Sequence, residues 1–315
     1  VIGGGSGGLA CSKQAAKLGK KVAVCDFVKP SPHGTTWGLG GTCVNVGCIP
    51  KKLMHQAALL GEAVKDAKEY GWDVEPPAHK WGEMVSAVQM HIKSLNFGYR
   101  SELMSNSVKY FNAFATFTDP NTVEAVDKKG KTTVITFDQA VLAMGGRPKY
   151  PEVPGIKEHC ITSDDIFSLA TPPGKTLVIG ASYVALECAG FLHGLGFETK
   201  VMMRSIPLRG FDQQMAAQIK GFMEQSGVEF IQGVPVAVET VGEKKKVKWA
   251  HGEAVGSEEF DTVMVAVGRD VCTSEIGLET TGVQVAPLRK IVSPLTLSCN
   301  AFSLALRERF SLPSC

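Results

Sequence analysis

Apolar residues recur along the chain with two different periods. A helical period occupies residues 9–18, 42 to about 70, 78–106 and 211–226. Short apolar runs predict buried strands at residues 21–26, 139–148, 176–179, 199–203, 228–239 and 260–268. Alternation over residues 108–117, 122–126 and 132–137 predicts a small antiparallel meander.

Strands and helices that alternate in this order predict an α/β fold. The chain repeats one unit, in which a strand, a glycine-rich turn, a helix and a second strand follow one another. We therefore expect two Rossmann-like dinucleotide-binding domains with three-layer ββα architecture, together with the small antiparallel meander. Residues 1–160 would form the first domain, residues 161–280 the second, and residues 281–315 an atypical tail.

The first glycine-rich turn, GGGSGG at residues 3–8, fits a G-x-G-x-x-G pattern with Gly3, Gly5 and Gly8. Asp26 ends the next strand, near the spacing expected for an acid that binds the ribose of a dinucleotide. Strand, glycines, helix, strand and acid together predict a dinucleotide site. The alternative is a plain glycine-rich turn followed by a surface aspartate.

The second turn, GASYVALE at residues 180–187, departs from this pattern. Gly180 keeps the first glycine, whereas Ser182 and Ala185 take the second and third places. Small side chains still permit close approach to a ligand.

Arg204, Ser205 and Arg209 follow the next strand, where an NAD site would place an acid. Arginine binds a 2′-phosphate through charge-assisted, fork-shaped hydrogen bonds. The residues therefore favour NADPH over NADH, and the alternative is that both arginines are merely solvated.

Two cysteines, Cys43 and Cys48, stand five residues apart behind a glycine cluster in GLGGTCVNVGCIPKK, residues 38–52. Thr42 is the expected N-cap of the apolar helix that follows. A thiol in a first helical turn lies near the positive end of the helix dipole, which favours the thiolate. Two such thiols can close and reopen a disulfide. The alternatives are a structural disulfide or half of a metal site, although no second Cys/His pair of finger spacing follows.

The segment GGTCVNVGCIPKK resembles the redox helix of the pyridine nucleotide–disulfide oxidoreductases, which include glutathione reductase, lipoamide dehydrogenase and the large thioredoxin reductases. The flanking WGLG and KLMHQAALLG, with the distant SIPLRGFDQQM, resemble most the large thioredoxin reductases of animals, the mitochondrial form in particular. The resemblance runs to about Val285.

This resemblance implies an NADPH-dependent flavoprotein disulfide reductase that passes electrons from NADPH to FAD, to a Cys43–Cys48 disulfide and then to thioredoxin. Cys48 would be the flavin-side thiol and Cys43 the interchange thiol. Lys51 would lie beside the flavin and pair with Glu187. Tyr183 would cover the flavin ring and swing aside to admit the nicotinamide.

The resemblance also implies which residues contact the cofactors. The FAD side would use Gly3, Gly5, Gly8, Asp26, Gly41, Thr42, Cys48, Lys51, Phe114, Ala115 and Gly145. The NADPH side would use Gly180, Ser182, Tyr183, Glu187, Arg204, Ser205 and Arg209, and would close at Gly268 and Arg269. Met144 stands where the family has threonine, so one hydroxyl contact with the flavin is missing.

The composition is that of an ordinary globular protein long enough for two domains, with 315 residues, 44% hydrophobic and 20% charged. A net charge of +2 gives no case for nucleic-acid or membrane binding, and no metal site is expected. Nine scattered cysteines suit a reducing compartment. The resemblance implies the mitochondrial matrix, with the cytosol as the alternative.

The tail after Val285 contains no glycine, so the family's second flavin fingerprint, which ends in Gly-Asp, is not expected there. The family's interface domain forms its homodimer and provides a His–Glu pair. The sequence pattern of the tail has no counterpart of this domain either. An alternative splice end or a misread gene boundary would explain the tail, and Cys299 and Cys315 are assigned no chemistry. We expect a poorly flavinated, mostly monomeric chain that retains some NADPH affinity and does not turn over. A glutathione reductase-like enzyme or a catalytically silent nucleotide-binding isoform remain alternatives.

Overall fold

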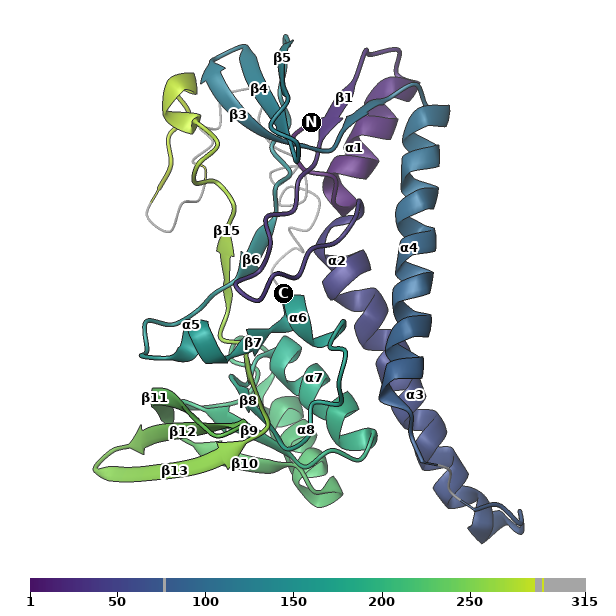
Figure 1. The fold of residues 1–315 in the computed structure, drawn as a ribbon, viewed down its shortest axis with the longest axis vertical. Helices are drawn as coiled ribbons and strands as arrows, with labels where there is room; N and C mark the ends of the chain where they lie inside the picture. The colour runs from purple at the N-terminus through teal and green to yellow at the C-terminus, as the bar shows by residue number, and fades with distance from the viewer. Residues whose placement is uncertain (76–77, 287–290, 292–315) are drawn as a thin grey trace, which may run out of the picture.

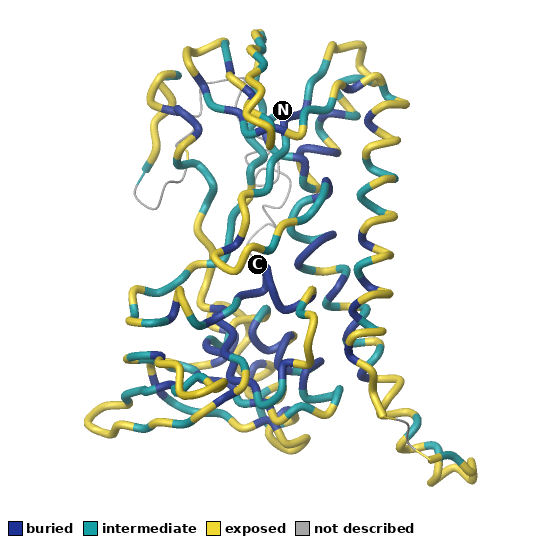
Figure 2. Tube along the Cα trace, in the orientation of Figure 1, coloured by how far each residue is buried: buried dark blue, intermediate teal, exposed yellow. Residues whose placement is uncertain are grey.

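The computed structural model describes residues 1–75, 78–286 and 291, and shows two units one above the other with two long helices along one side (Figure 1). Buried residues concentrate in the lower, second unit (Figure 2). No helix in the described ranges is long and apolar enough to cross a membrane. The expectations for most of the tail, Cys299 and Cys315 included, lie outside the described residues.

The first unit begins with a small parallel sheet. Strand β1 (Ala23–Cys25) pairs in parallel with β2 (Lys109–Phe111), while Ile2 forms parallel bridges with both Cys25 and Leu142. Helix α1 (Ser6–Lys17) follows the glycine-rich turn. The strand and helix predicted here are confirmed, and the turn leaves the sheet at its carboxyl edge.

An antiparallel meander of β3 (Ala113–Asp119), β4 (Thr122–Asp127) and β5 (Thr132–Thr136) covers this unit. The single strand predicted over residues 108–117 is wrong. The segment is divided because β2 pairs with the parallel sheet, whereas β3 pairs with the meander. The strand predicted over residues 139–148 is also wrong, since only the bridge at Leu142 and the short β6 (Gly146–Pro148) form.

The second unit is a five-stranded parallel sheet in the order β10-β9-β8-β14-β7. These strands are β7 (Ile161–Thr162), β8 (Thr176–Ile179), β9 (Thr199–Met203), β10 (Glu229–Gln232) and β14 (Thr262–Val265). The single strand predicted over residues 228–239 is wrong, because β10 ends at Gln232 and β11 (Val234–Val241) belongs to another sheet. With β12 (Lys244–His251) and β13 (Ala254–Phe260), β11 forms a second meander. The short helices α5 (Ile156–His159) and α6 (Ser163–Ile166) flank β7.

Side chains on successive positions of β8 point to opposite layers. Val178 packs with helices α7 (Tyr183–Gly194) and α8 (Gln213–Ser226), whereas Leu177 and Ile179 pack with the second meander. This alternation follows from the two-residue period of a strand. The expected three-layer ββα arrangement is thus confirmed.

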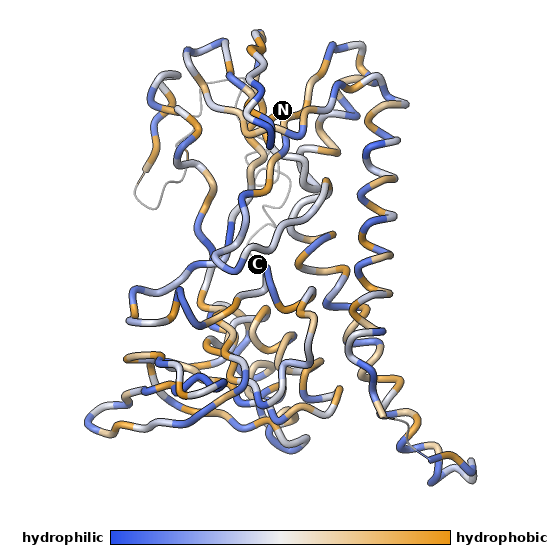
Figure 3. Tube along the Cα trace, viewed as in Figure 1, coloured by the Kyte–Doolittle hydropathy of each residue, from blue (hydrophilic) through white to orange (hydrophobic). Residues whose placement is uncertain are grey.

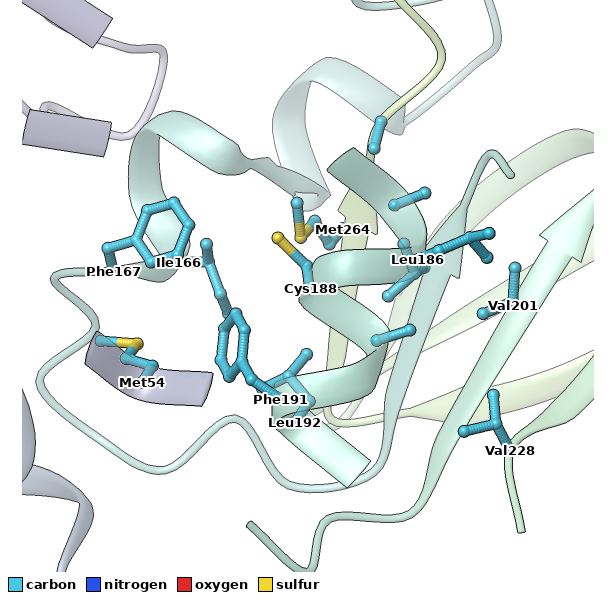
Figure 4. Close-up of a cluster of buried hydrophobic side chains, with 14 of the residues drawn as sticks. Met54, Ile166, Phe167, Leu186, Cys188, Phe191, Leu192, Val201, Val228 and Met264 are labelled. Atoms are coloured by element: carbon cyan, nitrogen blue, oxygen red, sulfur yellow. The ribbon is translucent and has the colours of Figure 1, made fainter. Parts of the chain in front are cut away.

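The two long helices, α3 (Cys48–Asp66) and α4 (Trp81–Ser105), join the core of the second unit. Met54 of α3 is fully buried and lies beside Phe167 and Phe191 (Figure 4). Along α4, apolar and polar positions alternate down the helix (Figure 3), and the buried positions include Val85, Val88 and Ile92. The helix predicted over residues 78–106 is therefore confirmed.

After β14 the chain returns to the first unit. Strand β15 (Arg269–Val271) pairs antiparallel with β6, and the Phe117 N–H donates to the Ile276 carbonyl at 2.8 Å. Ile276 and Leu278, at the short helix η2 (Leu278–Thr281), pack in the first unit's core. The first unit thus draws on chain from both sides of the second, and the division at residues 160 and 280 stays a prediction.

We expect Met54→Ala to lower the free energy of unfolding by about 2–5 kcal/mol, because it leaves a cavity between α3 and the second unit. Urea denaturation measures this loss. Leu60→Ala, an exposed position on the same helix, should change it by less than about 0.5 kcal/mol. Equal effects of the two substitutions would contradict the packing described.

Candidate redox and dinucleotide site

At Gly3 and Gly8 of the first glycine-rich turn, a side chain would collide with backbone atoms. Gly3 has φ +105°, and a Cβ there would lie 2.2 Å from the Ala143 carbonyl oxygen. At Gly8 a Cβ would lie 1.8 Å from the carbonyl oxygen of Gly3. Gly8 therefore allows α1 to pack tightly on the turn, and it is not among the residues that line the cavity described below.

Asp26 follows β1 and accepts a hydrogen bond from the Gly4 N–H at 2.8 Å. Burial raises the pKa of the Asp26 carboxyl, and the bond from Gly4 lowers it in part. The acid is thus held against the glycine-rich turn.

A second glycine cluster lies against the first. Gly41 has φ +72°, and a Cβ there would come within 2.6 Å of the Gly5 Cα. The Gly40 N–H donates to the Gly4 carbonyl at 3.0 Å. The two segments touch backbone to backbone, which brings the cysteine pair to the dinucleotide turn.

Thr42 is not the N-cap that the sequence predicts. Helix α2 (Gly41–Val46) is capped by Gly40, so Thr42 is its second residue. The Thr42 hydroxyl accepts a hydrogen bond from the Arg269 guanidinium at 3.1 Å, and that guanidinium also donates to the Gly146 carbonyl. Arg269 therefore lies against the cysteine-bearing segment.

The single helix predicted over both cysteines is also wrong. Gly47, with φ −150° and ψ −118°, ends α2 and caps α3. A Cβ at Gly47 would lie 2.9 Å from the Thr42 carbonyl oxygen. Cys43 is in the first turn of α2 and Cys48 is the first residue of α3, so each thiol stands at the start of a helix. The short helix η1 (Ala67–Tyr70) completes the predicted segment.

Both cysteines are free thiols in this structure, with Cys43 half-buried and Cys48 exposed. Burial raises the pKa of the Cys43 thiol to about 11, and a hydrogen bond between the Cys43 and Cys48 side chains adds to this. The nearby charge of Lys51 lowers this pKa by less. The expectation of a favoured thiolate is therefore wrong for Cys43, because burial is the largest influence on its pKa and raises it.

Lys51 and Glu187 are brought together by the packing of α3 on α7. Lys51 Nζ lies 2.7 Å from Glu187 Oε1, and both side chains are partly exposed. A Cβ at Gly194 of α7 would lie 2.9 Å from the Ala58 Cβ of α3, which shows how closely the two helices approach.

A cavity of about 640 Å³ lies beside the first glycine-rich turn and Cys43. Eight of the cofactor residues expected from the sequence line it, namely Gly3, Gly5, Asp26, Gly41, Thr42, Phe114, Ala115 and Gly145. Cys48 and Lys51 are not among its lining residues in the described structure. A cradle of glycines, a held acid and this volume fit the ADP end of FAD.

Arg147 also lines the cavity, and sequence reasoning missed it. Its guanidinium donates to Asp164 Oδ2 at 2.7 Å and to the Lys29 carbonyl at 2.8 Å, and lies 4.6 Å from the centre of the Trp37 ring. Burial raises the pKa of the Asp164 carboxyl, while Arg147 lowers it. The residue follows the Gly145-Gly146 pair, but nothing in the sequence pointed to Asp164 as its partner.

Further missed residues line the same cavity: Lys29, Trp37, Asp270 and Cys272. Lys29 Nζ lies 4.3 Å from the centre of the Phe114 ring. These residues come from the loop before α2 and from the chain that returns after β14. Their local sequence carries no nucleotide pattern, so only the fold places them here.

The second glycine-rich turn lies at the carboxyl end of β8, where parallel α/β sheets bind ligands. Gly180 has φ +123°, and a Cβ there would lie 2.3 Å from the Ala266 carbonyl oxygen. Ser182 caps α7, and Tyr183 is its exposed first residue. Gly268, with φ +135°, follows β14 on the neighbouring strand.

Arg204 and Arg209 lie exposed in the loop between β9 and α8. The Arg209 guanidinium donates to the Ser205 hydroxyl. The Leu208 N–H donates to the Ala181 carbonyl at 2.8 Å, which joins this loop to the second glycine-rich turn. Two exposed cations beside a glycine turn fit the phosphates of NADPH.

The described residues contain no group of three or more side chains that could hold a metal ion. The geometry is that of a dinucleotide-binding protein with a thiol pair at one of its two nucleotide sites. A family model for pyridine nucleotide-disulphide oxidoreductases matches residues 1–297, and the chain belongs to this family. The match extends beyond Val285, where the resemblance was expected to stop.

Thioredoxin reductase SEP1 of Emiliania huxleyi is 68% identical to this chain over 294 residues. The aligned part covers 92% of this chain and 59% of that protein, so the chain spans only part of its relative's length.

In the dithiol form of the protein, we expect iodoacetamide to alkylate Cys43 slowly at neutral pH. A raised pKa means that less thiolate is present at any pH below it, so the rate should climb until about pH 11. Tandem mass spectrometry of the peptide that contains both cysteines gives the rate at each position. A half-maximal rate for Cys43 below pH 8 would contradict the burial described here.

Proposed function

We infer that the protein is a flavin-dependent disulfide reductase that uses NADPH and reduces thioredoxin. The observation that carries this proposal is the contact between the two glycine clusters, Gly5 against Gly41, because it places a thiol pair at the edge of a dinucleotide cavity. Membership of the family and the thioredoxin reductase relative support it.

FAD, when bound, would accept electrons from NADPH and pass two of them to the Cys43–Cys48 disulfide. The residues that would hold it are the first glycine-rich turn, Asp26 and the other lining residues of the cavity. Glycines at positions 3, 5 and 41 leave the backbone free to approach the cofactor, while Asp26 can accept hydrogen bonds from ribose hydroxyls.

Cys43 would be the interchange thiol. Its raised pKa keeps it protonated in the dithiol form, so attack on an external disulfide requires a base or a change of surroundings that removes its proton. Lys51, held by Glu187, places a positive charge near the thiol pair. Cys48 would be the flavin-side thiol.

The finer identity is also part of the proposal. The sequence segments that flank the cysteines favour the large thioredoxin reductase type, which acts as a homodimer. The described cysteines are all free thiols, which suits a reducing compartment such as the mitochondrial matrix or the cytosol.

With excess FAD and no oxygen, we expect NADPH to convert the oxidised protein into a form with two additional alkylatable thiols. Cys48→Ser should remove this gain, because no disulfide can form with Cys43. Cys11→Ser, at another half-buried thiol, should leave it unchanged. Mass spectrometry after alkylation counts the thiols, and an equal gain in the Cys48→Ser protein would contradict the assignment of this pair.

Replacing both Arg204 and Arg209 by alanine should weaken NADPH binding by at least about tenfold and NADH binding little, because each charge-assisted bond contributes roughly 1.5–3 kcal/mol. Titration calorimetry of both nucleotides gives the comparison. The Lys128→Ala/Lys129→Ala double variant removes two charges from an exposed turn and serves as the control. Equal loss for both nucleotides would rule out a phosphate contact.

A further inference from the structure

The loop between β9 and α8 holds its arginines without fixing their charged groups. In the part of the chain that the structure describes, the Arg209 guanidinium donates to a neutral hydroxyl, Ser205, and no ion pair joins either Arg204 or Arg209 to a carboxylate. Both side chains are exposed. The direction of the two arginine side chains therefore depends on the backbone of the loop.

Two glutamine side chains fix that backbone. The Gln232 amide, at the last residue of β10, donates to the carbonyls of Arg204 at 3.0 Å and Ser205 at 3.2 Å. At the other end of the loop, the Gln213 amide donates to the carbonyls of Leu208 at 3.3 Å and Phe211 at 3.0 Å. Each amide NH₂ group has two hydrogens, one for each carbonyl.

The position of Gln232 is itself determined by the sheet. Strand β10 lies beside β9 (Figure 1), and Gln232 is paired with Met203 in the register of the two strands. The next residue, Gly233, donates its N–H to the Met203 carbonyl at 2.9 Å. The Gln232 side chain therefore extends past the end of β9, to the two residues where an NADP phosphate would bind.

We propose that Gln232 is a positioning residue that sets the preference for a nucleotide with a 2′-phosphate. The inference rests on the proposed function, since it needs Arg204 and Ser205 to contact that phosphate. With its amide in place, the two carbonyl oxygens stay turned toward β10. Without it, they are free to turn toward the nucleotide, where their partial negative charge would repel a phosphate and their rotation would redirect the Arg204 side chain.

The middle of the loop does not depend on Gln232. Leu208 is buried, has φ +47°, and bonds through its N–H to Ala181 of the second glycine-rich turn. This anchor joins the loop to the site of the adenosine and pyrophosphate portions of the nucleotide. Loss of Gln232 should therefore affect the 2′-phosphate contact and spare the rest of the site.

The test uses Gln232→Met, which keeps the length of the side chain and removes both donors. Titration calorimetry with 2′,5′-ADP and with 5′-AMP separates the phosphate contact from the remainder. We expect the preference for 2′,5′-ADP over 5′-AMP to fall about tenfold, the loss expected from two hydrogen bonds, with 5′-AMP affinity unchanged. Gln232→Asn, which stays polar but is too short to reach both carbonyls, should give a similar loss.

Gln214→Met is the matched control. Gln214 is exposed at the start of α8 and its side chain forms no hydrogen bond within the described ranges, so its replacement should leave the preference intact. If the unaltered protein shows no preference for 2′,5′-ADP, the proposed NADPH function is wrong. If it shows the preference and both Gln232 variants retain it, or if both nucleotides lose affinity equally, the positioning role is wrong.

Discussion

The contact between Gly5 and Gly41 is the constraint on which the candidate site depends. A single methyl group on Gly41 would overlap the backbone of Gly5, so the two segments can meet only while Gly41 lacks a side chain. This contact fixes where α2 begins and hence where Cys43 stands. It also joins a segment that would bind a nucleotide to the segment that contains the cysteine pair.

A second layer of contacts holds the loop before α2 against the second unit. The buried carboxylate of Asp165 accepts hydrogen bonds from the hydroxyls of Ser31 at 2.6 Å and Thr35 at 2.8 Å, while the neighbouring Asp164 binds Arg147. Asp164 and Asp165 belong to α6 of the second unit, whereas their partners line or flank the cavity of the first. Buried carboxyl groups require hydrogen-bond or charged partners, so these two aspartates hold the two units in one arrangement around the cavity.

The behaviour of Cys43 shows two electrostatic effects in opposition. The charge of Lys51 favours the thiolate of Cys43, but removal of water from the thiol disfavours it, and the second effect is larger at this position. A thiol that stays protonated until its surroundings change is suited to a step that must wait for a partner. The ion pair between Lys51 and Glu187 adds a fixed positive charge on the adjacent helix and ties that helix to the second unit.

The sequence by itself determined the elements whose cause is local. The repeated strand–turn–helix–strand unit predicted two α/β units, the spacing of Gly3 and Asp26 predicted a nucleotide turn, and the period of residues 78–106 predicted a helix. A close backbone approach or a buried helical face requires particular residues at particular spacings. Only the tertiary structure decided the division of residues 108–117 between two sheets and the pairing of Arg147 with Asp164. These depend on segments far apart in the chain. The raised pKa of Cys43 is of the same kind, since it depends on how much water the folded chain removes from the thiol, and no local pattern of residues specifies that.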